Sequence, residues 1–436
     1  MKINLLSEID YPLLLSAVLL TVFGILFIYS SGVTSFGVSV SNEYARQIFW
    51  GSAGLVIAIA VALFNYRRLY HALTYMYLGT LALLVYTCLF GRVVNGARAW
   101  IGVASFGVQP SEFAKLTTII FLARFLDSTK NSRNDAWRFI VSCLIVFAPM
   151  LIILLQPDFG TSLVFIAILL TMTFVSGISM RYIVFLLMTL ALSGLLMVLP
   201  LWQTHILGKT FRLLSMLSNK NFILIATAAL SMIFLLALFG FIRYKKKYFY
   251  WIAYCALITI LSLGISYGGQ KVLKPYQIMR LIVFLDPNID PRGSGWNIIQ
   301  SVTAIGSGGI LGKGYLQGTQ SHYRFLPQQS TDFIFSIYSE EWGFLGGVMV
   351  FMLFMLLILR MVRIMRTTAD TFGRYIVAGF AGMYVFHFMI NVGMTMGVMP
   401  ITGIPLLFMS YGGSSLITAM MGVGLALSVH IRRFQY

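Results

Sequence analysis

Charged residues, and acids in particular, are scarce in this chain. Only 10% of its 436 residues are charged, and Asp and Glu together number 13. A soluble domain usually carries about 25% charged residues, so this chain has too few to cover a water-exposed surface. With 59% hydrophobic residues, it is predicted to be an integral membrane protein.

The alternating strand pattern of a membrane β-barrel is also missing. The chain has instead apolar runs of about 20 residues, the length that spans a bilayer as a helix. Backbone groups in lipid must be hydrogen-bonded internally, so these runs are expected to be helices. About twelve spans are predicted, at 11–31, 46–64, 70–90, 112–127, 137–156, 160–177, 181–200, 222–242, 248–268, 343–365, 372–398 and 405–430.

Motifs for metal or cofactor binding are absent as well. The 3 cysteines lie inside predicted spans, and neither they nor the 5 histidines show a metal-binding spacing. No phosphate-binding P-loop is found. No cleavable-signal pattern opens the chain, so the first apolar run is expected to be retained. We therefore expect no cofactor built into the protein and no nucleic-acid partner.

Basic residues are plentiful, with 31 Lys and Arg and a net charge of +18. Short loops rich in Lys and Arg usually face the cytoplasm. With the N-terminus inside, the inner turns collect dense positive charge, including the run Arg243–Lys247. An even number of spans then places the C-terminus inside too, and a large loop at 269–339 outside.

Three of the few acids lie close together in LPQQSTDFIFSIYSEEWGFLGG, Leu326–Gly347. Asp332, at an apolar boundary, could act as a general base with a raised pKa, or could simply cap the helix that follows. If one helix ran from Asp332, Glu340 would lie on the same face, about 12 Å deeper. For Glu340 and Glu341, a salt bridge that holds the outer loop is the structural alternative.

Two further groups of polar residues lie near predicted span ends. Ser111 is expected to cap the helix that contains Glu112 and Lys115, which share a face because they are three residues apart. This pair is either a structural ion pair or a device that holds Lys115 for an anion. Asp158 follows Pro157 in a tight turn, which turn chemistry alone would explain.

Several long segments resemble the SEDS family (shape, elongation, division and sporulation), and GTQS within them is similar to its RodA branch. The matching segments cover nearly the whole chain: AWIGVASFGVQPSEFAKL (99–116), QPDFGTSL (156–163), YQIMRLIVFLDPNIDPRGSGWNIIQS (276–301), AIGSGGILGKGYLQGTQSHYRFLP (304–327), TDFIFSIYSEEWGFLGG (331–347) and NVGMTMGVMPITGIPLLFMSYGGSSL (391–416).

This resemblance implies a peptidoglycan glycosyltransferase that polymerises lipid II at the outer face of the cytoplasmic membrane. The essential acid of the TDFIF motif corresponds to Asp332, and the Glu and Lys of the PSExxK motif correspond to Glu112 and Lys115. We expect Asp332 to be the base, while Lys115 and Arg98 face the diphosphate, which could carry a divalent cation. The expected partners are a class B penicillin-binding protein with transpeptidase activity, lipid II, polyprenyl diphosphate and membrane lipid.

The chain departs from the family pattern in two places. The family usually has Glu and His before the TDFIF motif, where this chain has Gln328 and Ser330. The family core has ten spans, so an inserted helical hairpin is predicted within 201–275 of the single membrane domain, 1–436. A lipid II flippase and a scaffold for a transpeptidase remain the alternative functions.

Overall fold

The chain folds into two compact units, each described here by itself. The first comprises Met1–Ile178 and Gln300–Tyr436, and the second comprises Ser179–Ile299. The computed structural model describes residues 8–94, 96–102, 107–203, 216, 219–272, 275–291 and 293–433.

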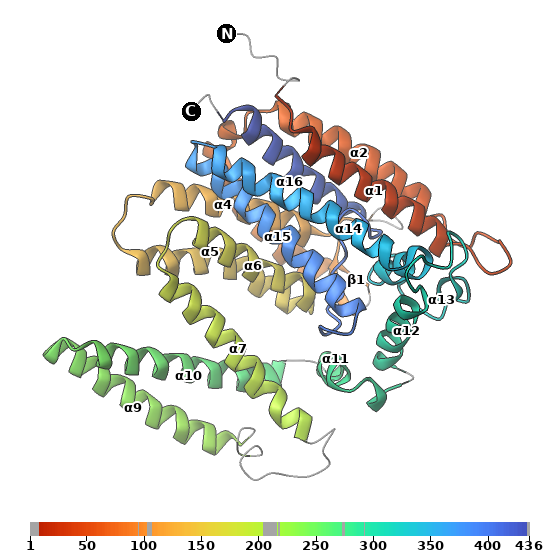
Figure 1. Ribbon diagram of the computed structural model, residues 1–436. Helices are drawn as coiled ribbons and strands as arrows, with labels where there is room; N and C mark the ends of the chain where they lie inside the picture. The colour runs from red at the N-terminus through yellow and green to blue at the C-terminus, as the bar shows by residue number, and fades with distance from the viewer. Residues whose placement is uncertain are drawn as a thin grey trace, which may run out of the picture. The chain divides into compact units, whose positions relative to one another are not determined.

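Nearly all the regular structure is helical (Figure 1). The first unit contains α1 (Tyr11–Ser31), α2 (Glu43–Leu63), the 3-10 helix η1 (Tyr66–His71), α3 (Leu73–Phe90), strands β1 (Arg92–Val94) and β2 (Ala97–Trp100), α4 (Pro110–Ser128), α5 (Asp135–Leu155), α6 (Phe159–Val175), α13 (Thr319–His322), α14 (Ile334–Thr367), α15 (Thr371–Thr395) and α16 (Gly413–Ile431). The second contains α7 (Met180–Trp202), α9 (Lys220–Tyr244), α10 (Lys247–Val272), α11 (Pro275–Leu285) and η3 (Pro287–Ile289), and α12 (Ser294–Ser307) crosses the boundary.

Each predicted span overlaps a helix, although the last, predicted at 405–430, begins only at Gly413. Within the described residues, 10 helices are long and apolar enough to cross a membrane. The two other predicted spans are α6, which has 17 residues, and α4, which carries Glu112, Lys115, Arg124 and Asp127. Most of α4 is buried within the first unit, so Glu112 and Lys115 are enclosed by protein rather than by lipid. The protein is therefore an all-α polytopic membrane protein.

The core of the first unit is formed by α4, α15 and α16. Helix α16 packs along α2, α15 packs against α6 and α14, and α4 packs against α3 and α15. Gly424 explains the close approach of α16 to α2, because a Cβ there would lie 2.5 Å from the carbonyl oxygen of Ala58. These buried helices supply the rigid frame on which the predicted site residues lie.

Three ion pairs lie at one end of the first unit. Two of them involve the ends of the described chain, and the third joins η1 to the turn before α15. Arg360, late in α14, pairs with Asp10 before α1 at 2.6 Å, and Arg433 pairs with Glu8 at 3.1 Å. Arg67 of η1 pairs with Asp370 at 2.5 Å. The first and last described residues therefore lie on the same side of this unit.

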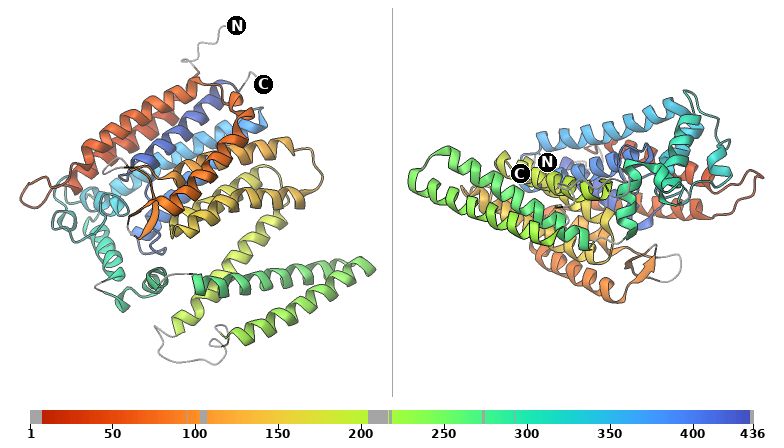
Figure 2. Two further views of the ribbon diagram at one scale, coloured as in Figure 1. Left: turned by 180° about the vertical axis from the view of Figure 1, so that it is seen from behind. Right: turned by 90° about the horizontal axis from the view of Figure 1, so that it is seen from below.

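In the second unit, α9 and α10 form an antiparallel hairpin that overlaps the ranges predicted for the insertion. They run side by side (Figure 2) and are joined at Lys245, which adopts a left-handed conformation with φ 52°. Helix α10 packs on α7, where Ser262 donates a hydrogen bond to the carbonyl oxygen of Thr189 at 3.1 Å. Most of the connection from α7 to α9 lies outside the described residues.

The stretch 269–339, predicted as a large loop, contains much regular structure. It includes α11, η3, α12 and α13, and the end of α10 reaches into it. The segment between α12 and α13 is held against α14 by hydrogen bonds, such as that from the Lys313 N–H to the Glu340 carbonyl oxygen at 3.1 Å.

Candidate active site

Asp332 lies in a turn immediately before α14. Its backbone N–H donates to the carbonyl oxygen of Gln328 at 3.1 Å, and its own carbonyl oxygen accepts from the Asn391 side chain at 2.9 Å. The residue at the N-cap of α14 is Phe333, without a side-chain cap. The N-cap position of α14 thus lies one residue after Asp332.

The carboxylate of Asp332 lies against the nonhelical segment between α15 and α16. A Cβ built on Gly403 would lie 3.6 Å from Asp332 Oδ2. Asn391 holds the two segments together, since its Nδ2 donates to the carbonyl oxygens of both Asp332 and Ile404, the latter at 2.8 Å. We call residues 400–406 the breaker segment, after its Pro and Gly residues.

The breaker segment also reaches the buried ion pair of α4. Lys115 Nζ lies 2.8 Å from Glu112 Oε1, and neither side chain is more than 4% exposed. Lys115 Nζ also lies 3.3 Å from His387 Nε2, while His387 Nδ1 lies 3.0 Å from the carbonyl oxygen of Pro405. A carbonyl only accepts hydrogen bonds, so Nδ1 carries the proton and Nε2 accepts from the Lys115 ammonium.

Asp158 lies close to this group but has a structural task of its own. It caps α6 by accepting from the Thr161 N–H at 3.1 Å, and Gln109 Nε2 donates to its other oxygen at 2.8 Å. Burial raises the pKa of Asp158, an effect that the Thr161 hydrogen bonds oppose. Two residues on, Gly160 permits close contact with the breaker segment, since a Cβ there would lie 2.4 Å from the Thr402 carbonyl oxygen.

Ser111 does not cap α4, contrary to the sequence prediction. The helix begins one residue earlier, at Pro110, and Gln109 is its N-cap. Proline suits the first helical position because its fixed φ is helical and it has no N–H to leave unpaired. Ser111 is fully buried in the first turn, and its Oγ has no hydrogen-bond partner among the described residues.

Arg98 lies on β2 and is exposed. Its Nη1 donates to the carbonyl oxygen of Leu89 at 3.1 Å, and its backbone N–H donates to Gln156 at 3.2 Å. The described contacts thus attach Arg98 to the end of α3 and to the turn before α6. They do not join it to Lys115 or Asp332.

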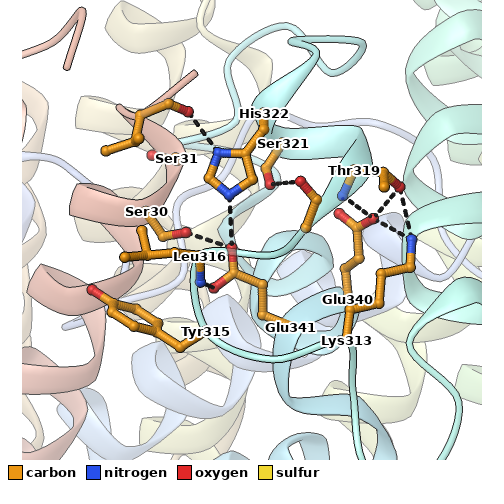
Figure 3. Close-up of polar contacts among 12 residues, drawn as sticks. Ser30, Ser31, Lys313, Tyr315, Leu316, Thr319, Ser321, His322, Glu340 and Glu341 are labelled. Atoms are coloured by element: carbon orange, nitrogen blue, oxygen red, sulfur yellow. Dashed lines mark hydrogen bonds and ion pairs between the residues drawn. The ribbon is translucent and has the colours of Figure 1, made fainter. Parts of the chain in front are cut away.

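Glu340 is fully buried and is surrounded by donors (Figure 3). Lys313 Nζ lies 2.7 Å from its Oε1, and the backbone N–H and hydroxyl of Thr319 donate to the same oxygen at 2.8 and 2.9 Å. Helix α14 begins at Ile334, so the condition of one helix running from Asp332 is not met: the Asp332 N–H donates back to Gln328. This geometry matches the structural alternative for Glu340.

Glu341, also fully buried, ties α1 to the segment before α13. Its carboxylate accepts from the Ser30 hydroxyl and from the Leu316 N–H, the latter at 3.1 Å (Figure 3). His322 Nε2 lies 3.8 Å from Glu341 Oε1, and its Nδ1 lies 2.7 Å from the carbonyl oxygen of Val33. Glu341 therefore supports the fold around α14.

Two residues of this site are not among those predicted from sequence. His387 and Asn391 lie four residues apart on α15, so they share one face of a largely apolar helix. Polar residues in a membrane span usually face the protein interior and mark functional sites, and this spacing was the available signal. Within the described part of the chain, no group of three or more His, Cys, Asp or Glu residues could hold a metal ion.

Comparisons with known proteins agree with the fold. The family model FtsW/RodA/SpoVE, described as a cell cycle protein, matches residues 11–222 and 210–435. The chain is 49% identical to the peptidoglycan glycosyltransferase RodA of Treponema pallidum, over 99% of this chain and 100% of that protein. It is 31% identical to the peptidoglycan glycosyltransferase MrdB of Escherichia coli K12, over 98% and 94%.

A solved structure also resembles the chain throughout. It comes from work titled "Structural coordination of polymerization and crosslinking by a peptidoglycan synthase complex", with a TM-score of 0.68 and 27% identity over 98% of this chain and 99% of that one. Sequence and structure comparisons thus cover the same, nearly complete length. The chain belongs to the FtsW/RodA/SpoVE family, the SEDS proteins, and within it is RodA-like.

Proposed function

We propose that this protein is a peptidoglycan glycosyltransferase that polymerises lipid II into glycan strands for cell elongation and shape. The observation that carries the proposal is the arrangement around the breaker segment. This one segment contacts the Asp332 carboxylate at Gly403 and the Lys115–His387 pair at Pro405. A base and a cation are the two groups that this reaction needs.

The base acts on the acceptor sugar. Asp332 accepts the proton of the acceptor 4-hydroxyl as its oxygen attacks the anomeric carbon of the donor. The bond from that carbon to the diphosphate breaks, and the configuration inverts in a single displacement. A glycosidase needs a second carboxyl group as an acid, but a diphosphate already leaves readily and requires no proton.

The cation acts on the leaving group. Negative charge builds up on the diphosphate in the transition state, and a preorganised cation lowers that energy. Lys115 serves this purpose, paired with Glu112 and oriented by His387. Arg98 contributes from its exposed strand, and a divalent cation arriving with the substrate would add to the same effect.

The remaining predicted residues support these two groups. Asp158 positions the N-terminus of α6 beside the breaker segment, and Ser111 lies in the same turn of α4 as Glu112. Glu340 and Glu341 hold the segment around Lys313 against α14. Each of these residues lies in the first unit.

The proposal also includes a location and a partner. Asp332 and Lys115 would face the outside of the cytoplasmic membrane, with both termini in the cytoplasm, in keeping with the ends that meet through the Arg433–Glu8 pair. The related synthase complex, which polymerises and crosslinks, supports the proposal that this protein has a crosslinking partner. We propose that this partner is a class B penicillin-binding protein.

Strand synthesis from purified lipid II in detergent tests the proposal. Loss of a general base usually lowers the rate by about 10²–10⁴-fold, so Asp332→Asn should make little or no polymer. The matched control is Asp286→Asn, the same change at an acid whose side chain caps η3 in the second unit; it should remain active. Normal polymer from Asp332→Asn would refute the assignment of the base.

The detergent assay also separates the alternative functions, because flipping has no meaning without a bilayer. A flippase or scaffold would yield no polymer from the unaltered protein, alone or with the transpeptidase. Polymer that appears only when the partner is added, and that is lost with Asp332→Asn, would support the proposed function and show that the partner activates it.

A further inference from the structure

The hairpin of the second unit ends in a concentrated positive charge that the proposed reaction does not use. Four cations lie at its turn, and a fifth begins α7; all five are exposed, and we call them the basic tip: Arg181, Arg243, Lys245, Lys246 and Lys247. Residues 179–299 contain two acids, Asp286 and Asp290. Both follow the opposite end of α10, a helix of 26 residues and so about 39 Å long.

Contacts within the unit bring the α7 cation to the hairpin turn. The hydroxyl of Tyr254 on α10 donates to the carbonyl oxygen of Arg181 at 2.7 Å. The Arg181 guanidinium lies over the ring of Tyr250, 5.8 Å from its centroid. Tyr250 is three residues from Lys247, hence on the same helical face one turn away. The five charges therefore occupy one end of the unit.

Exposed aromatic and apolar side chains border the basic tip. Tyr244, Tyr248 and Trp251 are each more than half exposed, and so are Phe239 and Ile242 farther along α9. Tyrosine and tryptophan prefer the level of the lipid headgroups, with apolar residues deeper in the membrane. The surface thus offers cations at headgroup depth, with an apolar helix face immediately below them.

We propose that the basic tip binds the headgroup of an anionic phospholipid, whose acyl chains lie along α9 and α10. Charge complementarity selects the headgroup, because clusters of four to eight Lys and Arg at a membrane surface attract anionic lipids. The adjoining apolar face selects an amphiphile over a soluble anion, which has nothing to place against Phe239 or Ile242. A zwitterionic headgroup, with no net charge, gains little from the five cations.

Quenching of Trp251 fluorescence by brominated lipids measures this binding directly. The full-length protein is placed in bilayers that contain brominated phosphatidylglycerol or brominated phosphatidylcholine. The signal that Trp251→Phe removes is the part that belongs to this residue. The unaltered protein should favour the anionic lipid at this position, and added salt should weaken that preference by screening.

The triple change Lys245→Gln, Lys246→Gln and Lys247→Gln should lower the preference for the anionic lipid by at least about tenfold. Each cation near an anionic surface contributes about fivefold, and the two arginines of the tip remain. Replacing the same three lysines with arginine should preserve the preference. A matched control removes three exposed cations from the first unit, Arg133, Arg363 and Arg366, and should leave the Trp251 signal unchanged.

Three results would overturn the proposal. One is a preference for anionic lipid that is the same in the glutamine variant and in the unaltered protein. Another is a first-unit control that loses this preference as much as the glutamine variant does. The third is displacement of the lipid by inorganic phosphate beyond that caused by chloride of the same ionic strength, which would indicate a site for a soluble anion. Chromatography and thermal unfolding establish that each variant is folded.

Discussion

Lys115 and Glu112 form an ion pair that is sealed from solvent, so each residue depends on the other. Their side chains are 1% and 4% exposed, and Glu112 Oε2 has no hydrogen-bond partner among the described residues. Removing one member of a buried pair leaves a charge without compensation and typically costs 3–5 kcal/mol, whereas removing both is often tolerated. Stability and activity therefore respond differently to the single and double changes.

We predict that Lys115→Met and Glu112→Gln each destabilise the protein by about 3 kcal/mol, and that the double variant recovers much of this loss. If Lys115 neutralises the diphosphate, the double variant should nevertheless remain inactive in strand synthesis. Lys130→Met is the control, because the Lys130 side chain is 48% exposed in its i,i+3 pair with Asp127, so its loss should cost less than about 1 kcal/mol. Restored activity in the double variant would leave the pair with a structural role alone.

Asp158 gives the protein a pH dependence of known sign. Burial raises the pKa of Asp158 in the folded protein above its unfolded value. The folded state therefore retains this proton more strongly, and the free energy of unfolding decreases as pH rises from the unfolded pKa through the folded pKa. Above that window, the cost of the buried carboxylate is fully present.

We predict that Asp158→Asn removes this decrease, because an amide does not titrate and asparagine is an equally good N-cap for α6. The difference between the thermal midpoint of the variant and that of the unaltered protein should increase in favour of the variant as pH rises from about 4 toward neutral. A thermal midpoint of the variant that falls in parallel with that of the unaltered protein would assign the pH dependence to other groups.

Sequence spacing predicts local pairs well and tertiary partners poorly. Glu112 and Lys115 are three residues apart on one helix, so their contact could be predicted before any fold was known. His387 and Asn391 lie far along the chain from Lys115 and Asp332, and only the packing of α15 against α4 brings His387 to Lys115. The N-terminus of α4 was misplaced because the preference of Ser111 for a cap was outweighed by Pro110 at the first helical position.

At the level of elements, α14 is two helical segments joined by a sharp bend at Gly343. This residue has φ 63° and ψ −160°, a combination essentially restricted to glycine. The bend leaves backbone N–H and carbonyl groups without partners inside the helix, and the chain after α12 forms hydrogen bonds with them. Lys313 and Gly314 N–H groups donate to the carbonyl oxygens of Glu340 and Glu341 at 3.1 and 2.9 Å, while Phe344 donates to Gly309 at 2.9 Å.

We predict that Gly343→Ala destabilises the protein by about 2 kcal/mol or more, from backbone strain alone. A Cβ at Gly343 would also lie 2.3 Å from the backbone nitrogen of Gly312, so the paired segment would have to move. Gly347→Ala is the control, since its Cβ would make an ordinary 3.8 Å contact with Phe335. Equal thermal unfolding of the two variants in detergent would contradict this account of the bend.

The length of the apolar runs was sufficient to predict the long helices of the described residues, because a bilayer leaves the backbone no alternative. The same reasoning places the start of the last part of α14 at residue 343, where the bend occurs. Apolar length could not predict the ordered segment after α12. The glycines of this segment form hydrogen bonds with backbone groups at the bend of α14, and that bend is seen only in the folded structure. The environment of Glu340 and Glu341 depends on that segment, so it could not be predicted from the sequence either.

At the scale of the whole molecule, the proposed reaction and the proposed lipid site fall in different units. All eight predicted site residues lie in the first unit, between Arg98 and Glu341. The basic tip and the α9–α10 hairpin lie in the second. If this division is functional, the two activities should be separable by removing the hairpin from the chain.

We predict that replacing residues 220–272 with a flexible Gly/Ser linker leaves strand synthesis in detergent within a few-fold of the unaltered rate. Helix α7 is apolar over most of its length, and lipid solvates an apolar helix surface about as well as another helix does. The linker must be long enough to avoid strain on α7 and α11, so several lengths are compared. The preference for anionic lipid should vanish in the same variant, measured by native mass spectrometry of the released protein–lipid complexes. A folded variant that has lost polymerisation at every linker length would show that the hairpin contributes to the reaction itself, and the two units would then have to be treated as one catalytic body.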